Sequence, residues 1–207
     1  MSIHLVSNGT RSLEHYSHIA KQVDSYVDYF HLREKQLTAR ELYNGALLLI
    51  KTGIQPEKII INDRIDVAMA LGVGVHLAYH SLPIHEVSRT FPSIQISSST
   101  HSLEEAREKA NAGARFLFFG HIYQTSSKPG LNPRGCKKLQ NVCQHVTKPV
   151  IAIGGITPEN VGEVLEHGAA GVAVMSGILN HHNPQASAKQ YHLAIKTWKG
   201  GHHEKTV

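Results

Sequence analysis

The chain has 207 residues, of which 41% are hydrophobic, so it can bury the core of a single domain spanning residues 1–207. No apolar run approaches the roughly 20 residues that cross a bilayer, and the first residues lack the basic start and cleavage site of a signal peptide. The formal charge of +5 comes from scattered Lys and Arg residues, which argues against nucleic-acid binding. We therefore expect a cytoplasmic protein that binds neither a membrane nor a nucleic acid.

Cysteine and histidine give little sign of a metal site. Cys136 and Cys143 are the two cysteines, and they form no CxxC motif, so they are typical of free thiols in a reducing compartment. The 16 histidines include the pairs at 181–182 and 202–203, which no carboxylate or cysteine completes in sequence. We expect no metal ion and no other cofactor.

Short apolar runs alternate along the chain with amphipathic stretches, which is the pattern of a parallel sheet with crossover helices. This spacing predicts the α/β class and a single (β/α)8 TIM barrel. The eight strands are expected to begin at Ile3, Tyr29, Lys58, Gly74, Ile94, Arg115, Pro149 and Gly171.

Helix boundaries are marked by capping residues. The stretch Thr38–Thr52 has helical apolar spacing, and Glu41 completes a capping box with Thr38. The motif Ser102–Glu105 has the same form, and Thr157–Asn160 is expected to open a later helix. Residues 199–207 are polar and are expected to form a flexible tail.

Two late strands end in small residues, a pattern that is typical of a phosphate-binding site. Val150–Ile156 and Gly171–Gly177 are β-branched runs that stop at small side chains, where backbone N–H groups can approach an anion. In a (β/α)8 barrel these would be strands seven and eight, where phosphate sites are common. We expect Gly155, Met175 and Ser176 to bind the phosphate of a small substrate, although tight packing also requires small residues.

Polar residues follow several other strands. Strand alternation would direct His31, Arg33 and Lys35 to one face, and the two cations suit a carboxylate or phosphate. A solvated surface run is the alternative. Asn62 is expected to bind substrate, whereas its neighbour Asp63 also suits a helix cap.

Two histidines lie at strand ends that face the expected site. His121 follows the run Arg115–Gly120, and we predict that it is a general base, although it could simply leave the strand. Ser99 and His101 end the fifth strand and are predicted to bind substrate. His101 is a second acid/base candidate, or a hydrogen-bond partner only.

An ordered set of motifs spans nearly the whole chain. The motifs are His31-Leu-Arg-Glu-Lys35, Ile61-Asn-Asp-Arg64, Gly74-Val-His-Leu77, Ser99-Thr-His-Ser102, Gly120-His-Ile-Tyr-Gln-Thr125 with Lys128, and the two phosphate strands. In this order and spacing the set resembles the family of thiamin phosphate synthase and thiazole tautomerase, which implies a TIM-barrel enzyme of thiamin biosynthesis. The resemblance implies that Thr125, Ser127 and Lys128 lie on a phosphate-binding loop, which could close over the site.

Three departures separate the two activities of this family. The synthase pattern expects Gln in place of His31, Gly-Pro in place of Gly120-His121, and an Mg²⁺-binding Asp in place of Ser81. The tautomerase pattern has a histidine that His121 matches. The resemblance therefore favours an isomerase without a cofactor, in which His121 moves a proton on a phosphorylated carboxythiazole and aromatises its ring.

The alternatives are a Mg²⁺-dependent synthase that uses a pyrimidine diphosphate and a non-catalytic, regulatory barrel. A homodimer is a common state for such barrels, and the sequence leaves the oligomeric state open.

Overall fold

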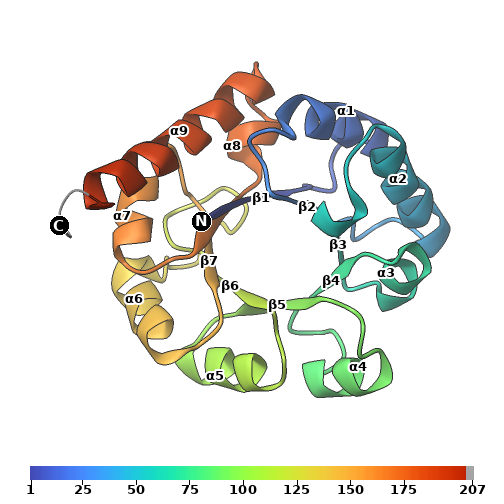
Figure 1. The fold of residues 1–207 in the computed structure, drawn as a ribbon, viewed down its shortest axis with the longest axis horizontal. Helices are drawn as coiled ribbons and strands as arrows, with labels where there is room; N and C mark the ends of the chain where they lie inside the picture. Colours follow the sequence, from blue (N-terminus) through green and yellow to red (C-terminus); the bar gives the residue numbers. More distant parts are fainter. Residues whose placement is uncertain (204–207) are drawn as a thin grey trace.

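A closed barrel of eight parallel strands forms the centre of the molecule in the computed structural model, which describes residues 1–203 (Figure 1). Each strand pairs with the next along the chain, and β8 pairs with β1 to close the barrel. The strands are β1 (Ser2–Val6), β2 (Tyr29–Leu32), β3 (Ile59–Asn62), β4 (Gly74–Leu77), β5 (Ile96–Thr100), β6 (Phe116–Gly120), β7 (Val150–Ile153) and β8 (Gly171–Val174). The predicted TIM barrel is confirmed.

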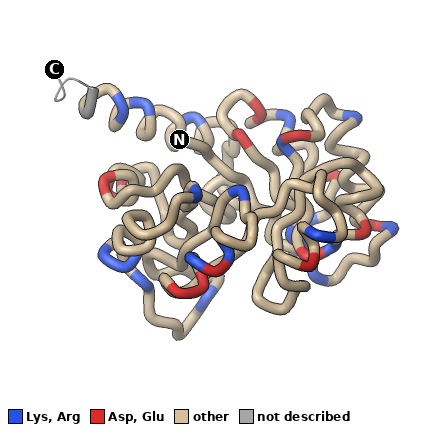
Figure 2. Tube along the Cα trace, turned by 60° about the horizontal axis from the view of Figure 1, so that its bottom comes forward, with Lys and Arg blue, Asp and Glu red and all other residues tan. Residues whose placement is uncertain are grey.

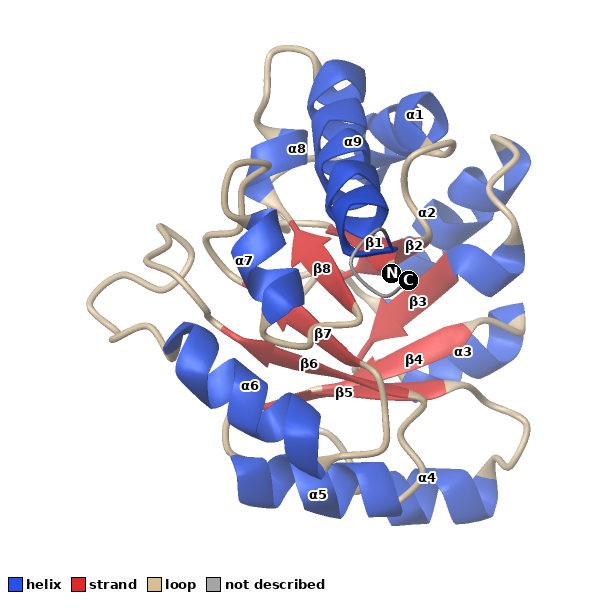
Figure 3. Ribbon diagram, turned by 60° about the vertical axis from the view of Figure 1, so that its left-hand side comes forward, coloured by secondary structure: helices blue, strands red, loops and turns tan. Residues whose placement is uncertain are grey.

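Helices surround the strands on the outside of the barrel (Figure 3). They are α1 (Leu13–Val23), α2 (Ala39–Lys51), α3 (Ile65–Leu71), α4 (Ile84–Thr90), α5 (Leu103–Asn111), α6 (Gly135–His145), α7 (Val161–Glu166), α8 (Ser176–Leu179) and α9 (Pro184–His203), with a 3₁₀ turn η1 (Pro56–Lys58). None of the helices within residues 1–203 is long and apolar enough to cross a membrane.

The core has two parts because each strand has two buried faces. The larger cluster fills the layer between the strands and the helices. The smaller cluster lies inside the barrel and includes Val6, Ile60, Phe116, Phe118 and Ile151. This arrangement explains why the strands are apolar runs rather than alternating ones.

Two of the three predicted helix starts are confirmed. The Thr38 side chain accepts from the backbone of Glu41, whose carboxylate accepts from the Thr38 backbone, so the capping box forms. Ser102 caps α5 through the backbone of Glu105, but the Glu105 carboxylate accepts instead from the backbone of His101. The Glu105 carboxylate therefore binds the residue before the N-cap instead of the N-cap itself.

The predicted start of α7 is wrong by three residues. The backbone N–H of Thr157 donates to the side chain of Asn160 at 2.8 Å, and this turn occupies the segment where the helix was expected. Asn160 is consequently the N-cap, and α7 begins at Val161.

The C-terminal helix α9 packs against α1, α7 and α8. It continues through Lys199 to His203, so the flexible tail expected from residue 199 is helical as far as 203. Residues 204–207, the remainder of that expected tail, lie outside the described residues.

Charged residues are spread around the outside of the molecule, with Lys and Arg interspersed among Asp and Glu (Figure 2). This distribution agrees with the scattered basic residues of the sequence.

Candidate active site

The carboxyl ends of the eight strands meet at one edge of the barrel, and the βα loops cover that edge. Most of the predicted site residues lie on these loops or in the last residues of the strands. The longest of the loops joins β6 to α6 and is called here the β6–α6 loop (residues 121–134).

Three histidines lie inside the barrel, where a TIM barrel more often has branched apolar residues. His4 Nδ1 and His31 Nε2 are 3.0 Å apart, and the second nitrogen of His4 contacts the hydroxyl of Ser2 at 2.9 Å. The His31 and His76 rings pack edge to face, with centroids 5.6 Å apart, and Phe118 contacts all three imidazoles. The barrel interior is therefore polar and aromatic along one side.

Burial keeps these histidines neutral. It lowers the pKa of His4 to about 3, with a smaller contribution from the charge of His76. It lowers the pKa of His76 to about 4, partly opposed by the Asp63 carboxylate. The pKa of His31 is also held well below its ordinary value by burial and then by the neighbouring histidines.

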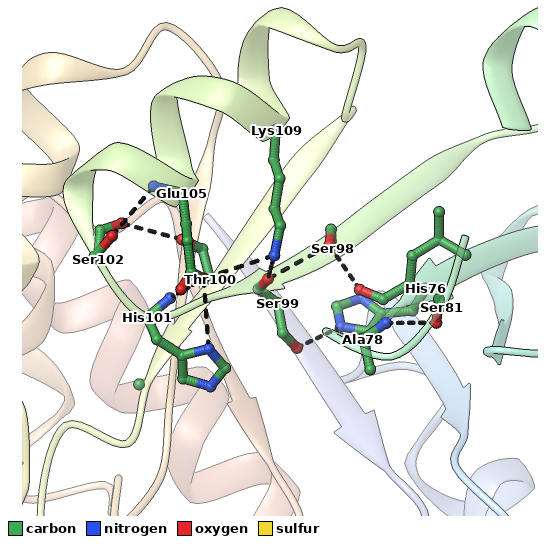
Figure 4. A network of polar contacts seen from close by, with 12 residues as sticks. His76, Ala78, Ser81, Ser98, Ser99, Thr100, His101, Ser102, Glu105 and Lys109 are labelled. Carbon is green, nitrogen blue, oxygen red and sulfur yellow. Dashed lines mark hydrogen bonds and ion pairs between the residues drawn. The ribbon is translucent and has the colours of Figure 1, made fainter. Parts of the chain in front are cut away.

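His76 is fixed in its orientation by two serine hydroxyls of the next strand, and Figure 4 shows the contact with Ser99. Its Nδ1 contacts Ser97 Oγ at 2.9 Å, and its Nε2 contacts Ser99 Oγ at 2.8 Å. Ser99 was predicted to bind substrate, but His76 was not singled out as a site residue. The signal was available, because β4 is four residues long and a lone polar side chain in it must face either the site or a polar partner.

Two buried polar atoms near these histidines lack a hydrogen-bond partner within residues 1–203. They are His31 Nδ1 and Asn62 Oδ1. Asn62 is paired in register with His76, so its amide lies at the site end of the barrel. A buried polar atom without a partner costs about 1–3 kcal/mol, and polar groups of a bound ligand can satisfy it.

Three cations gather at the site edge. The pKa of Lys128 is lowered first by burial and then by the positive charges of Arg134 and Arg33. The pKa of His101 is lowered by burial and then by Lys128 and Arg134. Lys128 is thus a shared neighbour of Arg33, of His101 and of Arg134, which was not among the predicted site residues.

Lys35 does not follow the expected alternation. Strand β2 ends at Leu32, and Lys35 lies beyond it in an exposed turn. His31 points into the barrel and Arg33 is half-buried, with its backbone N–H donating to Ser7 Oγ at 2.8 Å. The period-two pattern therefore holds only within the strand, which ends before Arg33 and Lys35.

His101 is held at the start of α5 (Figure 4). Its backbone N–H donates to Glu105 Oε2 at 3.0 Å, and its Nδ1 lies 3.6 Å from the same oxygen. Nearby, Lys109 Nζ donates to the backbone carbonyl of Ser99 at 2.6 Å. This network positions the end of β5 and leaves the His101 side chain 30% exposed at the edge of the site.

His121 is buried under the β6–α6 loop. Its Nε2 donates to the backbone carbonyl of Leu131 at 3.2 Å. Arg134 Nε donates to the Gly120 carbonyl at 2.8 Å, and the Arg134 backbone N–H donates to the His121 carbonyl at 2.9 Å. His121 therefore holds the loop in place.

The predicted phosphate-binding residues lie at the ends of the paired strands β7 and β8. Ser127 Oγ lies 4.0 Å from Met175 Sδ, which brings the β6–α6 loop to the start of α8 at Ser176. Thr125 shapes the same loop, since its Oγ1 accepts from the Ser127 backbone at 3.3 Å. A Cβ on Gly155 would lie only 2.5 Å from the Gln124 carbonyl oxygen, so packing also requires this glycine.

Asp63 lies where the resemblance places one of two Mg²⁺-binding carboxylates. Its Oδ1 accepts from the Ser81 hydroxyl and from the Ala78 backbone, and its Oδ2 is 3.4 Å from His80 Nε2. Within residues 1–203, no group of three potential metal-binding side chains includes Asp63. A single carboxylate, already hydrogen-bonded on Oδ1, does not fit a Mg²⁺–diphosphate site that needs a pair.

Sequence comparison identifies relatives over most of the chain. A sequence model of the family described as "Thiamine monophosphate synthase" matches residues 3–178. The chain belongs to this family. It is 38% identical over 168 residues to the thiamine-phosphate synthase of Clostridium acetobutylicum, covering 80% of each chain. It is 36% identical over 186 residues to that of Haloarcula marismortui, covering 86% of this chain and 88% of the relative.

Solved structures agree with this family membership. The thiamine phosphate pyrophosphorylase of Pyrococcus furiosus superposes with a TM-score of 0.81 at 25% identity, over 95% of this chain and 96% of that one. The 3-hexulose-6-phosphate synthase of Salmonella typhimurium has a TM-score of 0.76 at 16% identity and shares the fold alone.

These relatives contradict the expected isomerase. They are named as synthases, so the tautomerase interpretation is wrong. Three positions, His31, Ser81 and His121, carried that interpretation, whereas the relatives match over about 80% of the chain. In the structure, one ring nitrogen of His121, the residue that was expected to be the base, contacts the Leu131 carbonyl.

Proposed function

We propose that this chain is a transferase of the thiamine-phosphate synthase type. It would join a thiazole phosphate to a pyrimidine through a new carbon–nitrogen bond, as the carbon–oxygen bond to the pyrimidine's diphosphate breaks. The names of the curated relatives, 34–38% identical to this chain, carry this proposal. A phosphorylated small-molecule substrate follows from the family itself.

The cation cluster supports a diphosphate leaving group. Like charges at Arg33, Lys128 and Arg134 repel one another, and a bound polyanion removes that repulsion. Arginine also offers a planar pair of donors to phosphate oxygens. Negative charge grows on the diphosphate as the bond breaks, so these cations would stabilise the transition state more than the ground state.

The thiazole phosphate would lie at the ends of β7 and β8. Gly155, Met175 and Ser176 would bind it, and Thr125 and Ser127 of the β6–α6 loop would cover it. The pyrimidine would then face the barrel mouth, where Asn62 Oδ1 and His31 Nδ1 have no partner within residues 1–203. Neutral imidazoles can position a ring by hydrogen bonding without adding positive charge.

The direct test is formation of thiamine phosphate from the pyrimidine diphosphate and the thiazole phosphate, measured with Mg²⁺ and with a chelator. We expect product in both conditions, since Asp63 lacks the second carboxylate that a Mg²⁺–diphosphate site needs. No product in either condition, together with tight binding of thiamine phosphate, would instead indicate a non-catalytic barrel. The homodimer stays a prediction, which light scattering in solution would test.

A further inference from the structure

A second cluster of chemically reactive side chains lies on the outside of the barrel, between α6 and α7. Cys136 is in the first turn of α6, Glu163 is in α7, and His167 is the C-cap of α7. One sulfur, one carboxylate oxygen and one ring nitrogen of these residues all lie within 4.8 Å of one another. We propose that this cluster is a binding site for a divalent transition metal, with Zn²⁺ as the best match.

The donor set suits zinc. Zn²⁺ accepts thiolate, imidazole and carboxylate ligands together, whereas Mg²⁺ and Ca²⁺ prefer oxygen alone. Tetrahedral bonds of about 2.0–2.3 Å separate the ligand atoms by about 3.4–3.7 Å. The three atoms, all within 4.8 Å of one another, reach this spacing when each pair closes by at most about 1.4 Å, which side-chain rotations can supply.

His167 already makes a backbone contact of the kind that metal-binding histidines make. Its Nδ1 contacts the backbone carbonyl of Glu163 at 2.8 Å, and because a carbonyl only accepts, Nδ1 carries the proton. Nε2 then keeps a lone pair for a metal. Zinc-bound histidines commonly make this second contact, which fixes the tautomer.

Tyr123 adds an oxygen to the same cluster. Its hydroxyl donates to Glu163 Oε2 at 2.7 Å and lies 3.3 Å from Cys136 Sγ. With three protein ligands bound, the fourth position would hold water within reach of this hydroxyl. Tyr123 belongs to the β6–α6 loop, and its Cβ is 2.8 Å from the place of a Cβ on Gly155. Bound metal would therefore connect two helices to the loop beside the proposed phosphate site.

The first experiment titrates the full chain with Co²⁺ and follows the near-ultraviolet thiolate–cobalt band. We expect this band in the wild type, its loss in Cys136→Ser and its retention in Cys143→Ser. Cys143 is the other free thiol of the chain and is not part of the cluster. A wild type without the band, or a band that Cys143→Ser removes, would overturn the proposal.

The second experiment measures Zn²⁺ affinity by calorimetry in His167→Gln and in His145→Gln. These histidines are closely matched, since the Nδ1 of His145 also contacts a backbone carbonyl four residues earlier, at 2.8 Å, but His145 lies outside the cluster. We expect His167→Gln to weaken binding about 10-fold or more and His145→Gln to leave it unchanged. Equal effects would mean adventitious binding to surface histidines and would overturn the site.

If Cys136→Ser fails to fold, the two histidine variants still test the metal site. His167 is only half-buried, so we expect His167→Gln to fold. As an independent readout, Zn²⁺ should raise the melting temperature of the wild type and of His145→Gln, but not that of His167→Gln. Circular dichroism would verify that each variant is folded.

Discussion

The hydroxyl of Ser81 donates a hydrogen bond to Asp63 Oδ1, across the carboxyl ends of β3 and β4. The same oxygen accepts from the backbone of Ala78 at 3.0 Å. The synthase pattern has a carboxylate where Ser81 stands, so a neutral donor here replaces a negative charge. Asp63 is thereby a hydrogen-bonded acceptor that organises the loop after β4.

Ser81→Asp should place two carboxylates side by side and create a Mg²⁺ requirement. Without Mg²⁺ we expect a loss of about 1–3 kcal/mol in unfolding free energy, because the hydrogen bond becomes a repulsion. Added Mg²⁺ should recover much of that loss in the variant and change little in the wild type or in Ser81→Asn. Urea unfolding with and without Mg²⁺ measures these free energies. An equal increase in the unfolding free energy of the wild type on adding Mg²⁺ would contradict the prediction.

Lys128→Ala should weaken the proposed transfer reaction by removing one cation of the cluster. A charged hydrogen bond contributes about 1.5–3 kcal/mol, so we expect kcat/KM to fall about 10- to 100-fold. Lys137→Ala is the control, since Lys137 is an exposed residue of α6. Steady-state kinetics measures kcat/KM of the two variants. An equal fall of kcat/KM in both would exclude a specific role for Lys128.

His121→Ala should loosen the β6–α6 loop. The variant loses the contact to the Leu131 carbonyl and leaves a cavity, so we expect about 1–3 kcal/mol lower unfolding free energy and faster proteolysis between residues 124 and 133. Leu131→Ala keeps the backbone carbonyl and should leave both properties nearly unchanged. Unaltered proteolysis of His121→Ala would show that the loop is held by other contacts.

Gly155→Ala and Gly130→Ala separate two costs of replacing a glycine, which are backbone strain at positive φ and collision of the added Cβ with its neighbours. Both glycines have positive φ, at +68° and +76°, but a Cβ at Gly130 meets nothing within 4 Å. We expect a cost of about 1 kcal/mol for Gly130→Ala from backbone strain alone. Gly155→Ala should cost at least about 1 kcal/mol more, because its Cβ would also collide with Tyr123 and Gln124. Chemical denaturation of both variants tests the difference.

Stability should fall as the pH drops from about 6.5 towards 4. The pKa of His4 is lowered to about 3 and that of His76 to about 4, whereas unfolding returns both to about 6.5. The unfolded chain therefore binds more protons in this window, and each such histidine contributes about 1.4 kcal/mol per pH unit. His76→Asn should show a shallower slope than the wild type in urea unfolding between pH 7 and 5. An unchanged slope would mean that His76 titrates normally in the folded protein.

The barrel could be predicted from sequence because each strand is an apolar run buried on both faces. The starts at Tyr29, Gly74 and Gly171 agree with the observed strands, and the others differ by one or two residues. The start of α7 was missed because Asn160 forms a local turn that competes with the helix.

The site was harder to predict than the fold. Arg134 was missed because it reaches the cation cluster from the far end of a long loop, and no local pattern encodes that position. The proton-transfer role of His121 belonged to the isomerase that the relatives contradict, and its contact with the backbone carbonyl of Leu131, ten residues later, has no signal in the sequence. Strand alternation was extended to Lys35, although β2 ends at Leu32.

The β6–α6 loop is closed on itself at its base, where Arg134 and Gly135 donate to the backbone carbonyls of His121 and Ile122. Residues 124–133 can therefore change in length or composition while the ladder between β6 and β7 stays intact. A segment with this property can diverge faster than its surroundings. Substrate preference of this chain could therefore be altered by grafting another loop here, while its own histidine-lined barrel stays unchanged.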